Sequence, residues 1–328
     1  MRLALVVLAG CGGGSDPVAP DSSAGDAPQP GVCDDTAPWA SAAPLAIGPT
    51  QETAVVALDG KVYILGGFNG LTITTAVQVF DTQACTYSAG PPLPKAVHHI
   101  NAAVVDGTII VGGALEGGNF TAIGDTWQWN PLADADWTVR ASMPAGTQRG
   151  AGVAGAIDGK LFVAGGLRGG AVSDVSVYDP ALDEWTELPP MPIGRDHACG
   201  GVIDGRLYVA GGRNASIPST SPMTFAFTPG GAWEVVSPMI TGRGGTACGV
   251  IGDRLIVVGG EGNPDAASGV FPQVEAYTAS SNTWESLEPM PTPRHGMGAA
   301  ASGDRLYVPG GADVQGFGAV ATHEILTP

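Results

Sequence analysis

Short apolar runs that end in a glycine pair recur six times along the chain. Each run follows a turn made of Asp and Gly, and this combination is typical of a buried β-strand. The six segments read DGKVYILGG, DGTIIVGG, DGKLFVAGG, DGRLYVAGG, GDRLIVVGG and GDRLYVPGG. Their glycine pairs stand at 66–67, 112–113, 165–166, 211–212, 259–260 and 310–311, at spacings of 46 to 53 residues. The pattern predicts a series of β-rich modules, each close to 50 residues long.

Two further series follow the same period. Aromatic residues recur as Trp39, Tyr87, Trp137, Trp185, Trp233 and Trp284. Met-Pro or a counterpart follows most of them, at 93–94, 143–144, 191–192, 239–240 and 290–291. Strand-like segments lie between the glycine and aromatic series, at 77–81, 127–131, 175–180, 225–227, 274–277 and 323–326. Several features that repeat in register indicate a repeat architecture.

The combination of glycine pair, spaced Tyr, spaced Trp and Met-Pro over residues 39–328 resembles the kelch family. The resemblance implies an all-β fold, a six-bladed kelch-type β-propeller in which each blade is a four-stranded antiparallel meander. Strand A would be innermost, strand B would end at the glycine pair, and strands C and D would carry the Tyr-like residue and the Trp. Glycines without Cβ atoms would let strands approach where blades converge. The aromatics would fill the space between neighbouring blades.

The two ends of the repeat region predict how the ring closes. The last copy has a glycine pair and a strand C but no Trp strand, whereas a surplus strand with Trp39 precedes the first copy. We expect this N-terminal strand to become strand D of the sixth blade, because that pairing leaves no unpaired sheet edge.

The N-terminus resembles a bacterial lipoprotein leader. One basic residue and a short apolar run precede Leu8-Ala9-Gly10-Cys11, a sequence similar to a lipobox. We expect residues 1–10 to be a signal peptide and residues 11–38 to be a lipidated Cys11 with a flexible tether rich in Gly, Ser, Pro and Asp. Residues 39–328 would be the propeller. The chain would be exported and lipid-anchored in the cell envelope, by this resemblance in the outer membrane.

Composition and charge narrow the classes of function. The chain has 14 Lys and Arg against 31 Asp and Glu, a formal net charge of −17, which argues against nucleic-acid binding. Its 51 glycines and 27 prolines stand beside 44% hydrophobic residues, so the chain is not disordered as a whole. We expect a monomer without a cofactor, whose membrane contact is the lipid alone.

Four cysteines remain once Cys11 is assigned to the lipid. We expect Cys33 to pair with Cys85, and Cys199 with Cys248, because these pairs would be close in the propeller and an exported chain can form disulfides. Free buried thiols are the alternative.

The parity of a meander assigns the long loops to one face. A–B turns here are minimal, whereas the B–C loops are longer and variable and share their face with the D–A segments. These loops are 68–75, 114–125, 167–173, 213–223, 261–272 and 312–320. Variable loops on a rigid ring are a usual place for a binding surface.

Four arginines recur in the D–A segments, namely Arg149, Arg195, Arg243 and Arg294. One interpretation is a locally basic central pocket for a carboxylate, a sulfate or an acidic sugar, since Arg suits bidentate anion recognition. The other is that each Arg binds carbonyls of the blades, which we favour for Arg149 and Arg243. The resemblance to kelch propellers adds Arg213 and Asn214, which directly follow a glycine pair. The candidate ligand-binding residues are Arg195, His197, Arg213, Asn214, Arg243, Glu261, Arg294, His295 and His98.

Other candidate chemistry is weaker. His98 and His99 are adjacent, and neighbours in a strand point to opposite faces, so we expect no metal site from this pair. Glu261 and Glu116 stand early in their loops and are possible acid/base groups, although loop carboxylates are mostly solvated.

Three functions remain open. The first is a binding platform for a protein or a glycan, and it requires only the anchor, the tether and the loops. The second is a sugar-acid mutarotase resembling bacterial kelch enzymes that act on sialic acid, with Arg195, Arg294, His197 and Glu261 as candidates for its site. The third, a copper oxidase of the galactose-oxidase kind, is disfavoured because the five histidines are spread over unrelated loops. A serine hydrolase is disfavoured because the chain lacks a G-x-S-x-G elbow. We favour the binding platform, because a fold alone gives no evidence of chemistry.

Overall fold

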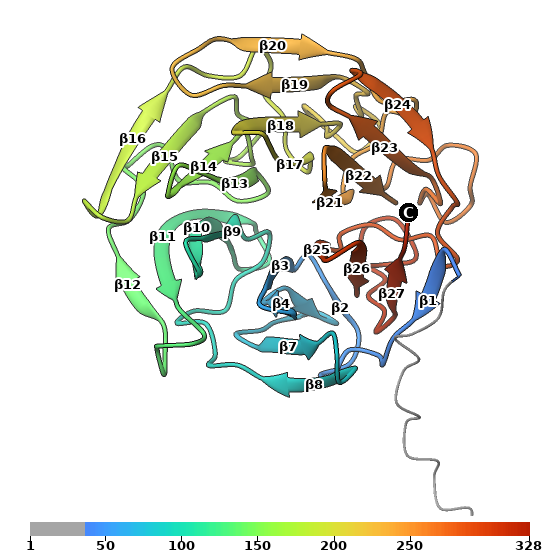
Figure 1. Ribbon diagram of the computed structural model, residues 1–328, viewed down its shortest axis with the longest axis horizontal. Coiled ribbons are helices and arrows are strands. Elements are labelled where there is room, and N and C mark those ends of the chain that lie inside the picture. The colour runs from blue at the N-terminus through green and yellow to red at the C-terminus, as the bar shows by residue number, and fades with distance from the viewer. Residues whose placement is uncertain (1–36) are drawn as a thin grey trace, which may run out of the picture.

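The computed structural model describes residues 37–328, which form a closed ring of six four-stranded antiparallel sheets around a central channel (Figure 1). The expected signal peptide, the lipidated Cys11, nearly all of the tether and Cys33 lie outside the described residues. Within 37–328, no helix is long and apolar enough to cross a bilayer. A seventh, three-stranded sheet is a small addition on the loop face and not a blade: it joins β2 (Thr50–Gln51), β5 (Phe68–Asn69) and β6 (Thr72–Ile73).

Each blade runs from strand A at the channel to strand D at the rim. Blade 1 contains β3 (Ala54–Leu58), β4 (Lys61–Leu65), β7 (Val77–Asp81) and β8 (Thr86–Ala89). Blade 2 contains β9 (Ala102–Val105), β10 (Thr108–Glu116), β11 (Thr121–Trp129) and β12 (Thr138–Arg140). Blade 3 contains β13 (Val153–Ile157), β14 (Lys160–Ala164), β15 (Val175–Asp179) and β16 (Glu184–Leu188).

The remaining blades repeat this order. Blade 4 contains β17 (Cys199–Ile203), β18 (Arg206–Ala210), β19 (Thr224–Phe227) and β20 (Trp233–Val236). Blade 5 contains β21 (Ala247–Ile251), β22 (Arg254–Val258), β23 (Val274–Thr278) and β24 (Thr283–Ser286). Blade 6 contains β25 (Ala300–Ser302), β26 (Arg305–Pro309), β27 (His323–Leu326) and, as its outer strand, β1 (Trp39–Ser41). The predicted blade count is confirmed.

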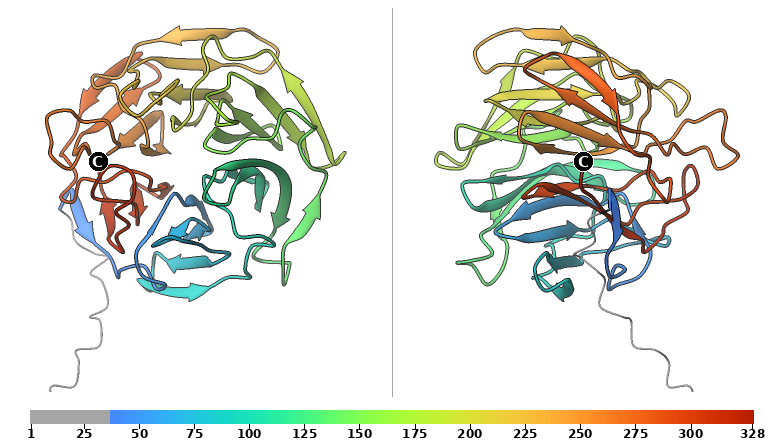
Figure 2. Two further views of the ribbon diagram at one scale, coloured as in Figure 1. Left: turned by 180° about the vertical axis from the view of Figure 1, so that it is seen from behind. Right: turned by 45° about the vertical axis from the view of Figure 1, so that its right-hand side comes forward.

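Ring closure follows the sequence prediction. Strand β1 pairs antiparallel with β27, with Trp39 opposite Leu326 and Ser41 opposite Glu324. Viewed from behind, the first and last described strands lie side by side at the edge of the ring (Figure 2). One sheet therefore contains strands from both ends of the described chain, and blade 6 has its full four strands.

The hydrophobic core is divided into six clusters, each between two neighbouring blades. One cluster joins Leu65 and Val77 of blade 1 to Ile109 and Trp127 of blade 2. The four clusters that follow around the ring join blades 2 and 3, 3 and 4, 4 and 5, and 5 and 6. The sixth joins Tyr307 of blade 6 to blade 1, so burial of apolar surface holds every interface of the ring.

In five blades a tryptophan on or beside the outer strand also makes a directed contact with its neighbour, whereas blade 1 has Tyr87 there. Trp185 Nε1 donates to the carbonyl of Ala141 in the preceding segment at 2.9 Å, and its ring lies 5.2 Å from that of Tyr178. Equivalent bonds run from Trp39 to Glu288, Trp137 to Pro91, Trp233 to Pro189, and Trp284 to Ser237. The predicted packing of aromatics between blades is confirmed, and each indole N–H also finds an acceptor.

The glycine pairs allow the close approach of neighbouring blades. At Gly165, which has φ +65°, a Cβ atom would lie 2.6 Å from the carbonyl oxygen of Arg195 in the next blade. The N–H of Gly166 donates to that same oxygen at 2.7 Å. A side chain at Gly165 would separate the two backbones, which explains why this position is glycine.

The cysteines only partly follow the expected pairing. Cys85 is disulfide-bonded, and its expected partner Cys33 lies outside the described residues, so that pairing stays a prediction. Cys199 and Cys248 stand on β17 and β21, the inner strands of neighbouring blades, but both thiols are free. The Cys248 thiol is hydrogen-bonded to the Cys199 thiol without a disulfide, and Cys248 Sγ also donates to the Gly200 carbonyl at 3.2 Å. The prediction of a disulfide between Cys199 and Cys248 is therefore wrong.

Candidate functional site

A closed ring of backbone hydrogen bonds surrounds one end of the channel. Six residues, one at the entrance of each strand A, contribute to it: Glu52, His99, Ala151, His197, Gly245 and Gly296. Each N–H donates to the carbonyl of the preceding member over 2.5 to 3.1 Å, and Glu52 closes the ring by donating to Gly296. All six have positive φ, between 51° and 64°. This shared conformation brings the six backbones together around the channel axis.

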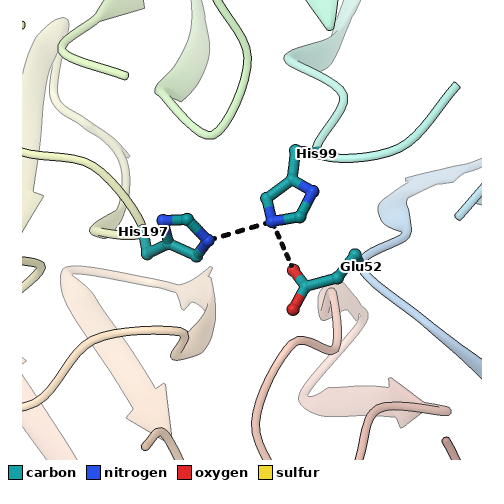
Figure 3. A group of neighbouring side chains, drawn as sticks. All are labelled: Glu52, His99 and His197. Atoms are coloured by element: carbon teal, nitrogen blue, oxygen red, sulfur yellow. Dashed lines mark hydrogen bonds and ion pairs between the residues drawn. The ribbon is translucent and has the colours of Figure 1, made fainter. Parts of the chain in front are cut away.

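Three ring members carry functional side chains that meet in the channel (Figure 3). His99 Nε2 lies 2.9 Å from His197 Nε2 and 3.1 Å from Glu52 Oε2. Both histidines are buried, and Glu52 is half-buried. The remaining members are alanine or glycine, and a Cβ at Gly296 would collide with the Glu52 carboxyl group. The small residues therefore leave the space that the three polar side chains occupy.

A second layer of polar groups holds the two imidazoles. His197 Nδ1 lies 2.5 Å from Asp196 Oδ1, and His99 Nδ1 lies 2.5 Å from His98 Nδ1. His98 Nε2 reaches the carbonyl of Gly117 at 3.1 Å. The strand pattern predicts that His98 and His99 point apart, and this prediction is wrong because His99, with φ +52°, is not in regular strand conformation.

Arg213 connects this group to the neighbouring blade. Its Nε lies 3.0 Å from Asp196 Oδ1, its Nη1 2.5 Å from Glu261 Oε1, and its Nη2 3.0 Å from His197 Nε2. His295 faces the same region from blade 6, with its Nδ1 3.6 Å from Glu261 Oε2 and 4.0 Å from Glu52 Oε1. Five of the six blades therefore contribute side chains to one polar cluster.

The cluster forms the floor of a pocket of about 180 Å³ on the loop face. Its lining residues are Gln51, Glu52, His99, Phe120, His197, Arg213, Ile217, Glu261, His295, Gly316 and Phe317. Phe317 is 53% exposed and its ring meets that of Phe68 edge-on at 5.4 Å. Gln51 holds the blade 6 loop in place, since its Nε2 donates to Gly316 and its Oε1 accepts from Gly318. The pocket thus combines a polar floor with an aromatic rim.

The pocket is acidic, which corrects the expected basic site. Counted formally with neutral imidazoles, the carboxylates of Glu52, Asp196 and Glu261 face the single guanidinium of Arg213, which leaves a charge of −2. Burial lowers the pKa of His99 well below 6.5, and nearby His197 lowers it further. Burial would raise the pKa of Asp196, but hydrogen bonds and charges from His197 and Arg213 outweigh it and lower that pKa.

The repeated arginines are structural. Arg149, Arg243 and Arg294 are 0% exposed, and each guanidinium donates to carbonyls at the end of strand B in its own blade. Two of them also form ion pairs with buried carboxylates, Arg243 with Glu275 at 2.6 Å and Arg294 with Glu324 at 2.7 Å. The predicted role of Arg243 and Arg294 in ligand binding is therefore wrong, because their N–H groups already donate to groups within the blades.

Other candidates also lie away from the pocket. Arg195 donates to the Gly194 carbonyl and to Ser221 Oγ at 3.0 Å each, so its expected ligand role is corrected too. Asn214 is exposed on the loop beside Arg213 and is not among the lining residues. His98 lies behind His99, and Glu116 pairs with Lys95 at 3.4 Å. Of the nine candidates, the structure brings His197, Arg213, Glu261 and His295 together in the pocket.

Glu52 is one of several pocket residues that are not among the sequence candidates; His99 and Phe317 are others. Glu52 stands 14 residues before Gly66, as His197 does before Gly211 and Gly296 before Gly310. In the first copy Thr50 occupies the position of the repeated Arg, so the Arg series does not point to Glu52. Counting back from the glycine pair would have identified it.

Comparisons with known proteins agree with this architecture. The family described as Kelch motif matches residues 49–94, 149–192 and 242–291. The Kelch-like protein terF of Aspergillus terreus is 34% identical over 286 residues, which cover 82% of this chain and 62% of that protein. Kelch-like protein 35 of Mus musculus is 32% identical over 139 residues, or 42% of this chain and 23% of that protein. This chain therefore spans under two thirds of the length of these two relatives.

Two further similarities concern smaller or more distant matches. An N-acetylneuraminate epimerase of Haemophilus influenzae (strain PittEE) is 32% identical over 126 residues, covering 36% of this chain and 31% of that enzyme. The solved structure of YjhT superposes with a TM-score of 0.72 at 18% identity, covering 85% of this chain and 95% of that one, which supports the fold alone. With its six four-stranded sheets, glycine pairs, interblade tryptophans and matches to the Kelch motif, the chain is a β-propeller built from kelch repeats.

Proposed function

We propose that this protein is a binding module that takes a glycan or a protein ligand on its loop face, at the mouth of the central channel. The observation that carries the proposal is the pocket itself, a polar floor built from five blades beneath an exposed aromatic rim. Concave sites that combine aromatic walls with a few fixed polar groups are the usual form of a small-ligand site. A glycan is the better candidate, because carboxylates and an arginine can bind its hydroxyl groups while Phe317 packs against a sugar ring.

The charge of the pocket narrows the ligand further. The formal charge of −2 favours an uncharged or positively charged group and opposes a carboxylate or sulfate. The guanidinium of Arg213 is already shared by Asp196 and Glu261, so an anionic ligand would compete with two buried carboxylates. Neutral or amino sugars are therefore the ligands we expect.

The expected position of the protein in the cell fits this role. A lipid on Cys11 would hold the propeller at the cell envelope, and the tether would let the loop face reach ligands near the membrane. Localisation in the outer membrane is part of the proposal. Comparing the membrane association of the Cys11→Ser variant with that of the wild type tests the lipid anchor, because loss of the thiol removes the site of lipidation.

A glycan array with neutral, amino and acidic sugars tests the binding proposal. We expect binding to neutral or amino sugars, and at least a tenfold loss of affinity in Phe317→Ala because the ring that packs against the sugar is lost. Removal of this exposed side chain should change the stability of the fold little. Leu182→Ala is the matched control: this residue is 66% exposed in the C–D turn of blade 3, on the opposite face. Absence of sugar binding, or equal loss in both variants, would contradict the proposal.

The second candidate is epimerisation of an acidic sugar, favoured by the similarity to N-acetylneuraminate epimerase over 126 residues. His197 and Glu52 could exchange a proton with a bound sugar. The excess of carboxylates argues against epimerisation of an acidic sugar. Such a substrate needs a free cation, and Arg213 already pairs with Asp196 and Glu261. Proton NMR of anomer exchange in N-acetylneuraminate decides directly: acceleration that His197→Gln abolishes would support the enzyme over the binding module.

A further inference from the structure

The floor of the pocket contains more hydrogen-bond acceptors than donors. Glu52, His99 and His197 each offer one ligand atom, and these three atoms all lie within 4.8 Å of one another. The three residues belong to blades 1, 2 and 4, so the fold brings their side chains together from distant parts of the chain (Figure 3). The protonation of each imidazole follows from the partner of its other nitrogen.

The hydrogen bonds from Gly117 through His98 to His99 leave Nε2 of His99 without a proton. The Gly117 carbonyl can only accept, so His98 Nε2 carries the hydrogen of that bond. A neutral His98 then accepts at Nδ1, and the 2.5 Å contact requires His99 Nδ1 to donate. In neutral His99 the proton is therefore on Nδ1, and Nε2 presents a lone pair to His197 and Glu52.

The same reasoning applies to His197. Asp196 Oδ1 accepts from His197 Nδ1 at 2.5 Å, so His197 Nε2 also presents a lone pair. Two imidazole lone pairs thus face each other at 2.9 Å, and a carboxylate oxygen lies 3.1 Å from one of them. Three acceptors at these distances repel one another, and Arg213 Nη2, 3.0 Å from His197 Nε2, faces only one of them.

A fourth acceptor faces the same carboxylates. His295 Nε2 donates to the Val314 carbonyl at 3.0 Å, which leaves Nδ1 as a lone pair. This Nδ1 is buried without a hydrogen-bond partner, in a residue only 1% exposed, and it points toward Glu52 and Glu261. Among the described residues that line the pocket, Arg213 alone carries a fixed positive charge. One guanidinium therefore faces the three carboxylates and the imidazole lone pairs that converge here.

We propose that Glu52, His99 and His197 bind a divalent first-row transition-metal cation, with Zn²⁺ as the representative. Two imidazole nitrogens and one carboxylate oxygen are a donor set that such ions use, and three protein ligands leave further positions open toward the pocket. The hydrogen bond from His197 to Asp196 is the outer-shell contact that metal-binding histidines usually make, and His98 plays that part for His99. A charge of +2 would balance the formal −2 of the cluster.

One existing contact must change when the cation binds. Arg213 Nη2 donates to His197 Nε2 at 3.0 Å, the lone pair that the metal would take. The guanidinium keeps its ion pairs with Asp196 and Glu261 through Nε and Nη1, so only this contact is exchanged. The inference does not rest on the proposed binding of a glycan, because the ligands are all protein groups.

Titration calorimetry of the full chain, purified without an affinity tag and stripped with EDTA, tests the site with Zn²⁺ and Co²⁺. We expect one ion per chain, a higher melting temperature with Zn²⁺, and at least tenfold weaker binding in Glu52→Gln and in His197→Gln. Glu116→Gln is the control, a glutamate on the same face that pairs with Lys95, and it should bind as the wild type does. Cooperative melting of each metal-free variant shows that its fold is retained.

The cysteines require a separate arm, because Cys199 and Cys248 are free and lie along the same channel. The absorption spectrum of the Co²⁺ complex should lack a thiolate charge-transfer band, and the Cys199→Ser/Cys248→Ser variant should retain the affinity. The proposal is overturned if the wild type binds no stoichiometric ion, if Glu52→Gln and His197→Gln bind as tightly as the control, or if the double serine variant loses the ion.

Discussion

Trp39 and Leu326 are opposite each other in one antiparallel strand pair, although 287 positions separate them along the chain. Trp39 Nε1 also donates to the carbonyl of Glu288 at 3.1 Å, so this residue joins blade 6 to the segment that follows blade 5. The N-terminal strand thus completes a sheet and clamps an interface at once. Closure of the ring depends on the segment that precedes the first repeat.

Replacement of Trp39 by Ala should measure this closure. We expect a loss of about 2 kcal/mol in the free energy of unfolding, less than for a fully buried Trp because the indole is only half-buried. Val139→Ala is the control, since Val139 is 69% exposed on the equivalent outer strand β12 and should change stability by less than about 0.5 kcal/mol. Urea unfolding followed by circular dichroism compares the two. Equal midpoints would show that β1 does not hold the ring.

The buried ion pair between Arg243 and Glu275 makes a second prediction. Arg243→Met leaves the Glu275 carboxylate, 1% exposed, without its cation, and we expect a loss of about 3–5 kcal/mol. Arg254→Met in the same blade breaks the exposed pair with Glu285 and should cost under about 1 kcal/mol. Chemical denaturation of both variants checks this. If Arg243→Met were as stable as Arg254→Met while ligand binding fell, the arginine would be a ligand residue after all.

These arginines show where sequence reasoning reaches its limit. A guanidinium binds a carbonyl oxygen and a ligand carboxylate through the same donors, so the repeated Arg alone could not distinguish the two roles. Only its position in the fold does, since Arg149, Arg243 and Arg294 are fully buried against strand B. The fold itself was predictable because glycine pairs, tryptophans and strand segments repeat in register and each has one structural reason.

The pocket was predictable only in part. His197, Arg213, Glu261 and His295 stand at repeat positions that the sequence analysis singled out, but the copies differ in residue type there. Glu52, from the first copy, carries no Arg two positions before it and was missed. The convergence of His99 with His197 could not be foreseen from a strand pattern, because it depends on a positive φ at both residues.

Gly165→Ala should show that the glycine pair sets the spacing of blades. Its Cβ would lie 2.6 Å from the Arg195 carbonyl, so we expect steric strain of about 1–3 kcal/mol in addition to the cost of a positive φ. Gly169→Ala is a close control, because Gly169 has a similar φ of +69° but no neighbour within 4 Å of a Cβ. The difference between the two unfolding free energies isolates the contact between blades. No difference would mean that the backbones can move apart without cost.

His323 makes a prediction about pH. Burial, with a smaller contribution from the charge of Arg294, lowers the pKa of this imidazole from 6.5 to about 3. Below pH 6.5 the unfolded chain binds a proton at His323 and the folded chain does not, so this site makes stability fall as the pH falls from 6.5 towards 3. The slope is at most about 1.4 kcal/mol per pH unit, and the site has no effect well above pH 6.5.

The variant His323→Phe should remove that slope. Tyr87 Oη and His323 Nδ1 form a hydrogen bond of 2.8 Å, so His323→Phe also loses a hydrogen bond and should be less stable than the wild type at pH 7. Tyr87→Phe is therefore the matched control, because it loses the same bond but keeps the imidazole. Unfolding free energies at pH 7 and pH 5 should diverge less in His323→Phe than in either the wild type or Tyr87→Phe. Three parallel profiles would mean that His323 is protonated in the folded protein at pH 5, and that its burial does not exclude the charge.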